Sequence, residues 1–308
     1  MISTLKQNIA RAVVGKDEVV DLLLTALLSE GHVLIEDVPG VGKTTLVSAL
    51  ARSLSCSFKR IQFTPDITPS DITGFTMPSL TGEMTYHPGA VLSQIVLADE
   101  INRTSPKTQS ALLEVMEERQ VTVDGRTYPL ERPFMVLATQ NPVDFVGTYP
   151  LPEAQMDRFL MRISIGYPAP EDETDILERY SSTESPLSRV EPVCTPADIL
   201  ALQEQVRSVY CAREVRAYIV SLCSATRSVS SLTLGVSTRG AIALCHAAQA
   251  NALLQGRDYI VPEDVAHLAL PVLSHRLVLS AEARMADLTP EAILGSLLEK
   301  VRVPVRRR

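Results

Sequence analysis

The stretch from residue 36 to residue 45 has the residue types and the spacing needed to bind phosphate groups. An apolar run leads into a turn rich in Pro and Gly, after which Lys43 and Thr44 open an expected helix. In such a loop, backbone N–H groups and the helix N-terminus surround phosphates, the Lys reaches the β- and γ-phosphates, and the hydroxyl binds Mg²⁺. We therefore expect a nucleotide to be bound by Pro39, Gly40, Val41, Gly42, Lys43, Thr44 and Thr45.

One residue departs from the usual phosphate-loop pattern G-x-x-x-x-G-K-[ST]. The first Gly of that pattern falls at position 37, which is Asp37 in this sequence. A carboxylate facing the phosphates would repel them. We expect the Asp37 side chain to point away, because Gly40 and Gly42 still allow the tight turn and Pro39 restricts the entry to it.

Polar residues also follow two further apolar runs, each a strand candidate. Asp99 and Glu100 come directly after one run, and Asn141 follows another. Ligands bind at the carboxyl ends of parallel strands. Asp99 is thus placed to hold Mg²⁺ together with Thr44, Glu100 to polarise the attacking water, and Asn141 to hydrogen-bond the water or the γ-phosphate. The alternative is an ordinary turn at a strand end, and Asn-Pro is a common turn.

Phosphoryl transfer requires more positive charge than one Lys and one Mg²⁺ supply. An added arginine, from the same chain or from a neighbour, can raise the rate by about 10³ to 10⁵. The candidates are Arg103, Arg158, which follows a short expected helix, and Arg239, in the first turn of a long one. Each could instead form a surface ion pair, which is the commoner role of an arginine.

The composition argues against several classes of function. The 308 residues carry a net charge of −7, no Trp and 5% aromatic residues, which argues against broad nucleic-acid binding. No run approaches the roughly 18 apolar residues of a membrane span, and the N-terminus has no secretory pattern. The five cysteines show no CxxC and no metal-ligand spacing, which favours reduced thiols and a cytoplasmic location.

The order of expected elements divides the chain in two. Strand and helix candidates alternate over residues 31–165, which predicts a parallel α/β domain. After residue 188 no strand is convincing, and helix-start signals dominate. We expect a nucleotide-binding core over residues 1–167, a linker over 168–188 and a helical domain over 189–308.

Three smaller features complete the pattern. Residues 75–78 and 84–87 are short strand candidates on either side of Thr81-Gly82, and Asp124-Gly125 separates another pair, so two hairpins are expected. The three C-terminal arginines are interpreted as a solvated tail.

Together these segments resemble an AAA+ ATPase and, more closely, the MoxR family. The resemblance extends over nearly the whole chain and is carried by residues 34–44, 97–103, 109–121, 138–142 and 152–159, and by the helical-part motifs Gly235-Val236-Ser237-Thr238-Arg239 and His275-Arg276. It implies a five-stranded parallel sheet with flanking helices, followed by a small all-α lid domain.

The resemblance also assigns roles within a site for ATP or ADP with Mg²⁺. It implies that Lys43 and Thr44 belong to Walker A, Asp99 and Glu100 to Walker B, and Asn141 to sensor 1. It further implies that Arg158 is the arginine finger reaching a neighbour's γ-phosphate, that Arg239 is sensor 2, and that Val14 and Gly15 line the adenine. Arg103 is a second candidate for the arginine acting on a neighbour.

Proteins similar to this family form rings, expected to be hexamers, that act as chaperones maturing partner protein complexes. They often work with a protein carrying a von Willebrand factor A domain, and we expect neither membrane insertion nor nucleic-acid binding. Two alternatives stay open at this point. One is a nucleotide-gated binding module with little hydrolysis, supported by Asp37 alone, and the other is a motor subunit similar to that of magnesium chelatase.

Overall fold

The computed structural model describes residues 1–79, 83–141, 147–181 and 184–304. Three predicted features lie outside the described residues: the Thr81-Gly82 turn, Pro142 of the Asn-Pro turn, and the arginine run at the C-terminus. Among the helices that are described, none is long and apolar enough to cross a membrane.

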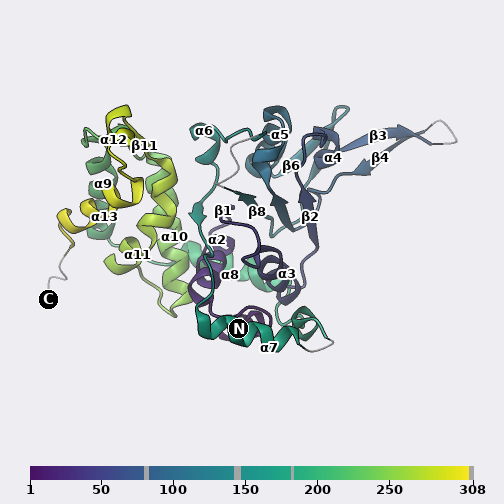
Figure 1. Ribbon diagram of the computed structural model, residues 1–308, viewed down its shortest axis with the longest axis horizontal. Coiled ribbons are helices and arrows are strands. Elements are labelled where there is room, and N and C mark those ends of the chain that lie inside the picture. Colours follow the sequence, from purple (N-terminus) through teal and green to yellow (C-terminus); the bar gives the residue numbers. More distant parts are fainter. Residues whose placement is uncertain (80–82, 142–146, 182–183, 305–308) are drawn as a thin grey trace. The chain divides into compact units, whose positions relative to one another are not determined.

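A five-stranded parallel sheet forms the centre of the first half of the chain (Figure 1). Its order is β2-β5-β8-β1-β9, built from β1 (Val33–Glu36), β2 (Phe58–Gln62), β5 (Ile95–Asp99), β8 (Met135–Gln140) and β9 (Met161–Ile163). Nearly every residue of β5 and β8 is buried, as expected for strands covered on both faces. The predicted sheet with flanking helices is therefore confirmed.

Several helices accompany this sheet, and one of them begins at Lys43 as predicted. They are α1 (Ile2–Ile9), α2 (Asp17–Leu28), α3 (Lys43–Ser53), α4 (Pro69–Thr73), the 3-10 turn η1 (Ile101–Arg103), α5 (Pro106–Glu118), α6 (Glu153–Met156) and α7 (Pro170–Tyr180). Helix α5 begins at Pro106, because Ser105 caps it by accepting the N–H of Thr108 and Pro106 is favoured at the first helical position.

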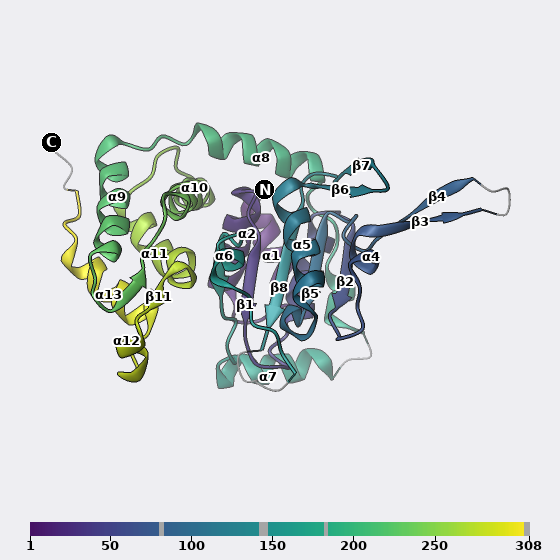
Figure 2. The same ribbon diagram turned by 90° about the horizontal axis from the view of Figure 1, so that it is seen from above.

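Two antiparallel hairpins interrupt the alternation, as predicted. β3 (Gly74–Pro78) pairs with β4 (Met84–Pro88), and β6 (Gln120–Val123) pairs with β7 (Arg126–Pro129). Asp124 and Gly125 both have positive φ, which is what a two-residue hairpin turn requires. Figure 2 shows the β3–β4 hairpin extending well beyond β2.

The C-terminal part is a bundle of helices with one small sheet. It contains the 3-10 turn η2 (Pro186–Arg189), α8 (Pro196–Ser208), α9 (Arg213–Arg227), α10 (Thr238–Leu254), α11 (Pro262–Leu273), the 3-10 turn η3 (Ser274–Arg276), α12 (Ala281–Met285) and α13 (Pro290–Lys300). Helix α10 packs against α9 and α11, and α13 packs against α9 and α11 as well.

Two sequence-based expectations are wrong in this region. Strands β10 (Leu232–Leu234) and β11 (Val278–Leu279) form an antiparallel pair where no strand was expected, because segments of two or three residues are too short to show a period. The polar stretch interpreted as a linker contains α7, whose start is marked by Pro170 at its first position and by three acidic residues in its first turn.

The chain forms two compact units that are not continuous in sequence. The first contains residues 1–23, 32–151 and 163–200, and the second contains 24–31, 152–162 and 201–308. The short segment that carries Arg158 thus belongs to the same unit as the helical bundle. The boundaries at residues 167 and 188 stay a prediction.

Candidate functional site

The predicted phosphate loop has the backbone geometry that such a loop requires. Gly40 and Gly42 have φ values of 91° and 86°, in the left-handed region that favours glycine. Gly42 is the N-cap of α3, so the first helical residue is Lys43. The N–H groups of the first turn of α3 are therefore available to an anion at this end of the helix.

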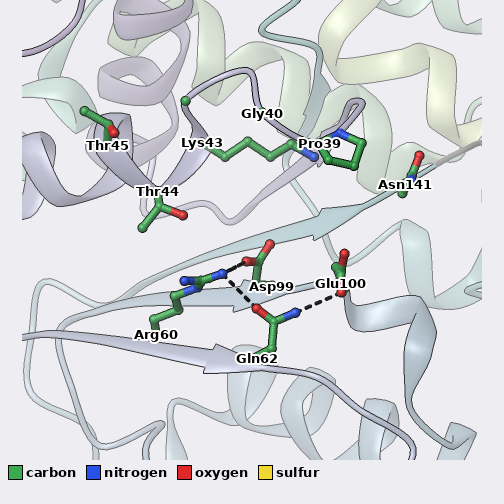
Figure 3. A pocket seen from close by; sticks show the side chains of 11 residues that line it. Pro39, Gly40, Lys43, Thr44, Thr45, Arg60, Gln62, Asp99, Glu100 and Asn141 are labelled. Carbon is green, nitrogen blue, oxygen red and sulfur yellow. Dashed lines mark hydrogen bonds and ion pairs between the residues drawn. The ribbon is translucent and has the colours of Figure 1, made fainter. Parts of the chain in front are cut away.

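A cavity of about 400 Å³ lies beside this loop (Figure 3). It is lined by residues from the loop, from the start of α3 and from the ends of three strands: Pro39, Gly40, Gly42, Lys43, Thr44, Thr45, Arg60, Gln62, Asp99, Glu100 and Asn141. Nine of these residues are ones that the sequence predicts. The predicted residues Val14, Gly15 and Val41 are not among them, and Arg158 and Arg239 belong to the second unit.

Strand register explains why residues distant in sequence meet at this cavity. Gln62 is the register partner of Asp99, and Ala98 is the partner of Ala138. The ends of β2, β5 and β8 therefore lie level with one another. Asn141 comes immediately after β8 and is 9% exposed.

The Asp37 carboxylate faces away from the cavity, as expected. Its Oδ2 accepts the backbone N–H groups of Ile165 and Gly166, at 2.5 and 2.8 Å, and the hydroxyl of Ser164 at 3.1 Å. The residue is 7% exposed. Asp37 thus replaces the usual glycine without placing charge against the phosphates, because its carboxylate is used to hold residues 164–166.

The segment that Asp37 holds is also held by a cation. Lys16 Nζ donates to the carbonyl oxygens of Ile165, Gly166 and Tyr167, at 2.8, 3.1 and 3.0 Å. The Asp37 carboxylate thus accepts the N–H groups of this turn, and the Lys16 ammonium donates to its carbonyl oxygens. Gly15 lies directly before Lys16 with a φ of 64°, and a Cβ there would come within 1.9 Å of the Asp172 carboxylate and would have to displace it.

Lys43 is held at the mouth of the loop. Its Nζ donates to the backbone carbonyl of Asp37 at 2.7 Å. Partial burial lowers the pKa of Lys43 from its ordinary value, while the carboxylates of Asp37, Asp99 and Glu100 act in the opposite direction. The ammonium group therefore already lies among acidic groups before a nucleotide adds its own negative charge.

The Asp99 carboxylate has a different partner on each oxygen. Oδ1 accepts the hydroxyl of Thr139 at 2.6 Å, and Oδ2 accepts Nη2 and Nε of Arg60 at 2.6 and 3.1 Å. The Arg60 side chain is 46% exposed, whereas that of Asp99 is 14% exposed. An exposed guanidinium thus pairs with the carboxylate that is expected to bind the metal ion.

Glu100 is restrained by its backbone and by its side chain. It adopts a left-handed conformation with φ of 58°, and its N–H donates to the Thr139 hydroxyl at 2.9 Å. Gln62 Nε2 donates to Glu100 Oε2 at 2.8 Å, and Arg103 Nε lies 3.4 Å from the same oxygen. Such a backbone is uncommon outside Gly, and it aims the carboxylate from the end of β5 (Figure 3).

Sequence reasoning missed three residues of this network: Arg60, Gln62 and Thr139. Arg60 and Gln62 are two residues apart on β2, so both point to the same face of the sheet, and Arg60 Nη2 also donates to Gln62 Oε1 at 2.8 Å. Polar residues with this alternation on a strand beside Asp99 were a signal that could have been read. Thr139 had no such signal, because a single Thr in an apolar strand is ordinary.

The two predicted arginines of the second unit lie near the ends of helices, Arg158 just after the short α6 and Arg239 at the start of the long α10. Arg158 follows α6 and is half-buried, whereas Arg239 is the second residue of α10 and is exposed. Arg103, the third candidate, belongs to the first unit and lies next to Glu100.

Two family models match the chain. The ATPase family associated with various cellular activities (AAA) matches residues 32–161, and the AAA lid domain matches residues 224–296. The first range contains the phosphate loop and the carboxylates, and the second contains Arg239.

Similar proteins extend over nearly the full length of the chain. YeaC of Bacillus subtilis is 52% identical over 98% of this chain and 94% of its own length. Chaperone MoxR1 of Mycobacterium tuberculosis is 43% identical over 96% of this chain and 81% of its own length. The crystal structure of a protein from Cytophaga hutchinsonii assigned as an ATPase has a TM-score of 0.93 and 39% identity, and the match covers 99% of this chain and 95% of that one.

Proposed function

This chain belongs to the MoxR family of AAA ATPases and hydrolyses ATP, and from that premise we propose that it is a ring-forming chaperone that remodels partner protein complexes. The observation that carries the ATP-hydrolysis part of the proposal is the meeting of Lys43, Thr44, Asp99, Glu100 and Asn141 at one cavity, and the chaperone part is supported by the likeness to Chaperone MoxR1. A phosphate cradle, a metal-binding carboxylate and a second carboxylate for water are the minimum set for hydrolysing a nucleoside triphosphate.

We assign the steps of hydrolysis to these residues. Lys43 and the N–H groups at the start of α3 bind the β- and γ-phosphates, and Asn141 orients the water or the γ-phosphate. Glu100 accepts a proton from the attacking water as the new P–O bond forms and the bond to the ADP oxygen breaks. Gln62 Nε2 and Arg103 Nε both lie at Glu100 Oε2, so they restrain this carboxylate through one of its two oxygens.

Thr44 and Asp99 would hold Mg²⁺. A hydroxyl and a carboxylate are hard oxygen donors, and Mg²⁺ commonly takes only one or two protein ligands and completes its shell with phosphate oxygens and water. The donor set of the cavity therefore fits this ion. When bound, Mg²⁺ neutralises charge that develops on the phosphate oxygens.

The substitution Glu100→Gln tests the assignment. It preserves size and hydrogen bonding but removes the base, so we expect ATP binding to persist while turnover falls by about 10² to 10⁴. Phosphate release and binding of a fluorescent ATP analogue measure the two quantities. A turnover rate equal to that of the wild type would remove Glu100 from the reaction.

The ring and its arginine finger form the second part of the proposal. We infer that the chain forms a ring, expected to be a hexamer, in which Arg158 reaches the nucleotide of a neighbouring subunit and Arg239 contacts the nucleotide of its own. Light scattering should show larger assemblies with ATP than without it, and Arg158→Ala should lower turnover with little change in ATP binding. A monomer at all ATP concentrations would contradict an arginine acting between subunits.

The two hairpins offer a surface for a client protein. Phe75, Met77 and Met84 on the β3–β4 hairpin are 45%, 50% and 58% exposed. Tyr86 of β4 stacks on Tyr128 of β7 with ring centroids 4.0 Å apart, so the hairpins support each other. We propose that these apolar side chains contact the client, because large exposed apolar groups on a projecting element favour protein binding.

We propose a protein with a von Willebrand factor A domain as the partner, and a cytoplasmic location in keeping with the five free cysteines. Capture with the Glu100→Gln variant in the presence of ATP should retain the partner, and the added substitution Met77→Asp should release it without affecting ATP binding. Retention by both variants would place the contact elsewhere.

The alternative of a nucleotide-gated module with little hydrolysis has lost its support. It depended on a carboxylate at position 37 that opposes the phosphates, and the Asp37 side chain is directed to residues 164–166 instead.

A further inference from the structure

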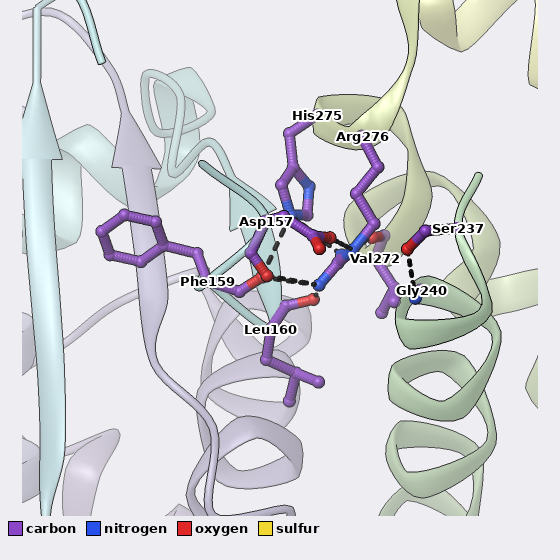
Figure 4. Close-up of polar contacts among 8 residues, drawn as sticks. All are labelled: Asp157, Phe159, Leu160, Ser237, Gly240, Val272, His275 and Arg276. Atoms are coloured by element: carbon purple, nitrogen blue, oxygen red, sulfur yellow. Dashed lines mark hydrogen bonds and ion pairs between the residues drawn. The ribbon is translucent and has the colours of Figure 1, made fainter. Parts of the chain in front are cut away.

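A buried arginine of the lid binds the chain on both sides of Arg158 (Figure 4). Arg276 Nε donates to the Asp157 carboxylate at 2.7 Å, Nη2 to the carbonyl of Phe159 at 2.8 Å, and Nη1 to the carbonyl of Leu160 at 3.1 Å. Only 4% of the Arg276 side chain is exposed. The residue before Arg158 and the two residues after it are therefore held by one guanidinium group.

The same guanidinium is fixed to the lid on its other side. Nη1 also donates to the carbonyl of Val272, one turn earlier in the chain. Gly240 of α10 lies against the Arg276 stem, since a Cβ at position 240 would meet Cδ of Arg276 at 2.9 Å and Cγ1 of Val236 at 2.6 Å. Gly240 directly follows Arg239, so the lid residue expected to contact the nucleotide is one peptide bond away from the contact.

The chemistry of this cluster favours a fixed geometry. Burial lowers the pKa of Arg276, and the adjoining Asp157 carboxylate acts in the opposite direction. A planar guanidinium offers donors in fixed directions, and a lysine in its place could reach only some of these acceptors. Neighbouring His275 is also buried, with Nε2 placed 3.1 Å from the Phe159 carbonyl.

We propose that Arg276 is a positioning residue that couples the two arginines of the ATPase cycle, by holding the Arg158 segment against the start of helix α10, which carries Arg239. This inference rests on the proposed roles of Arg158 and Arg239. Arg158, which acts on a neighbour's nucleotide, and Arg239, which contacts the chain's own nucleotide, are then packed together through Arg276. A change in the nucleotide bound at one site can thereby change the position of the arginine at the next site around the ring.

The proposal is tested with assemblies that contain two different variants. An arginine finger acts on the neighbouring subunit, whereas a folding defect affects only the subunit that carries it. Two differently tagged chains are co-expressed and purified through both tags. Arg276→Lys is combined with Glu100→Gln, whose site is inactive but whose Arg158 segment is intact. In a random mixture about half of the Arg276→Lys sites would face an intact finger, by analogy with arginines supplied in trans.

We expect the homogeneous Arg276→Lys assembly to lose at least about tenfold in kcat, with less than about a threefold change in the KM for ATP. Mixing with Glu100→Gln should restore activity per Arg276→Lys subunit. Arg158→Ala mixed with Glu100→Gln should show the same restoration, and Lys43→Ala mixed with Glu100→Gln should show none, because neither subunit then has a working site.

A second variant approaches the cluster from the lid side. Gly240→Ala leaves every hydrogen-bonding group in place but displaces the Arg276 stem, so it should lower kcat and be restored by the same mixing. Gly295→Ala in α13 is the matched control, because a Cβ at that helical glycine would meet nothing within 4 Å beyond its own stretch of helix, and it should behave as the wild type.

The outcomes distinguish the role of Arg158 as an arginine finger from the positioning role of Arg276. If the Arg158→Ala mixture regains activity and the Arg276→Lys and Gly240→Ala mixtures do not, the positioning role of Arg276 is overturned while the finger stands. If the Arg158→Ala mixture also fails to regain activity, the finger itself is wrong and the coupling falls with it.

Discussion

The two polar clusters of this chain, one in each compact unit, are built in opposite ways. At the ends of the strands, Arg60 and Gln62 hold the carboxylates of Asp99 and Glu100 through side chains that are in contact with solvent. In the second unit, Arg276 is buried and satisfied by a carboxylate and three backbone carbonyls.

This difference indicates what each cluster can do. Exposed ion pairs contribute little and exchange readily with water or other ions, so the first cluster can release its carboxylates to a metal ion and a water molecule. A buried charge with all of its partners in place is costly to disturb, so the second cluster holds one geometry. The first site is suited to changing partners and the second to transmitting a position.

The largest expected effect tests the fixed cluster. Arg276→Met keeps an apolar stem of similar length but leaves the Asp157 carboxylate and the carbonyls without their donor. Removing one partner of a buried ion pair typically costs about 3 to 5 kcal/mol of unfolding free energy. Chemical denaturation followed by circular dichroism measures this loss. A cost below about 1 kcal/mol, as for an exposed pair, would erase the contrast between the clusters.

A smaller effect tests whether a polar group is fixed because it is buried or because it belongs to the second unit. His32 lies in the first unit, yet it is buried and fixed: Nε2 is 3.1 Å from the Met116 carbonyl, and Nδ1 accepts the N–H of Val136 at 3.0 Å. Burial lowers the pKa of His32 to about 4. The unfolded chain therefore binds a proton on His32 near pH 6.5, whereas the folded chain binds it only near pH 4. The free energy of unfolding consequently falls as the pH drops from 6.5 towards 4.

We expect this proton to cost about 2 kcal/mol of unfolding free energy between pH 7 and pH 5. Urea unfolding at the two pH values measures the difference, and His32→Gln should reduce the pH dependence by that amount because it no longer titrates. Equal pH dependence in the two proteins would mean that His32 is not held neutral by burial.

The same division between exposed and fixed groups explains how much the sequence could predict. That Lys43, Asp99 and Glu100 meet at one cavity was predictable, because phosphate chemistry demands particular residue types at strand and helix ends and because the alternation of strands and helices that positions them is long and regular. The partners Arg276 and Asp157 are 119 residues apart, and their contact depends on packing that no local period encodes. The β10–β11 pair was not predicted either, because its strands are too short to show a period.

A third prediction concerns Asp37, a fixed carboxylate beside the exchangeable site. Asp37→Ala removes the acceptor of the backbone N–H groups of Val38, Ile165 and Gly166, and unsatisfied buried donors cost about 1 to 3 kcal/mol. We expect lower stability and no gain in ATP affinity, because the carboxylate does not face the phosphates. Thermal unfolding and ATP titration provide the two measurements, with Asp66→Ala as an exposed control. Clearly tighter ATP binding by Asp37→Ala would show that the carboxylate does oppose the nucleotide.

The smallest expected effect tests the exchangeable cluster itself. Arg60 pairs with the Asp99 carboxylate that we propose binds Mg²⁺, and an exposed pair of this kind contributes about 0.2 to 1 kcal/mol. Arg60→Leu should therefore lower the Mg²⁺ concentration for half-maximal turnover by up to about fivefold at saturating ATP. The effect should shrink in high salt, which screens exposed charges. Lys59→Leu is the control, because this exposed neighbour on β2 alternates to the other face of the sheet and should leave the Mg²⁺ requirement unchanged. If Arg60→Leu instead raises the Mg²⁺ requirement, the guanidinium assists the bound cation and nucleotide, and the first cluster is then as fixed as the second.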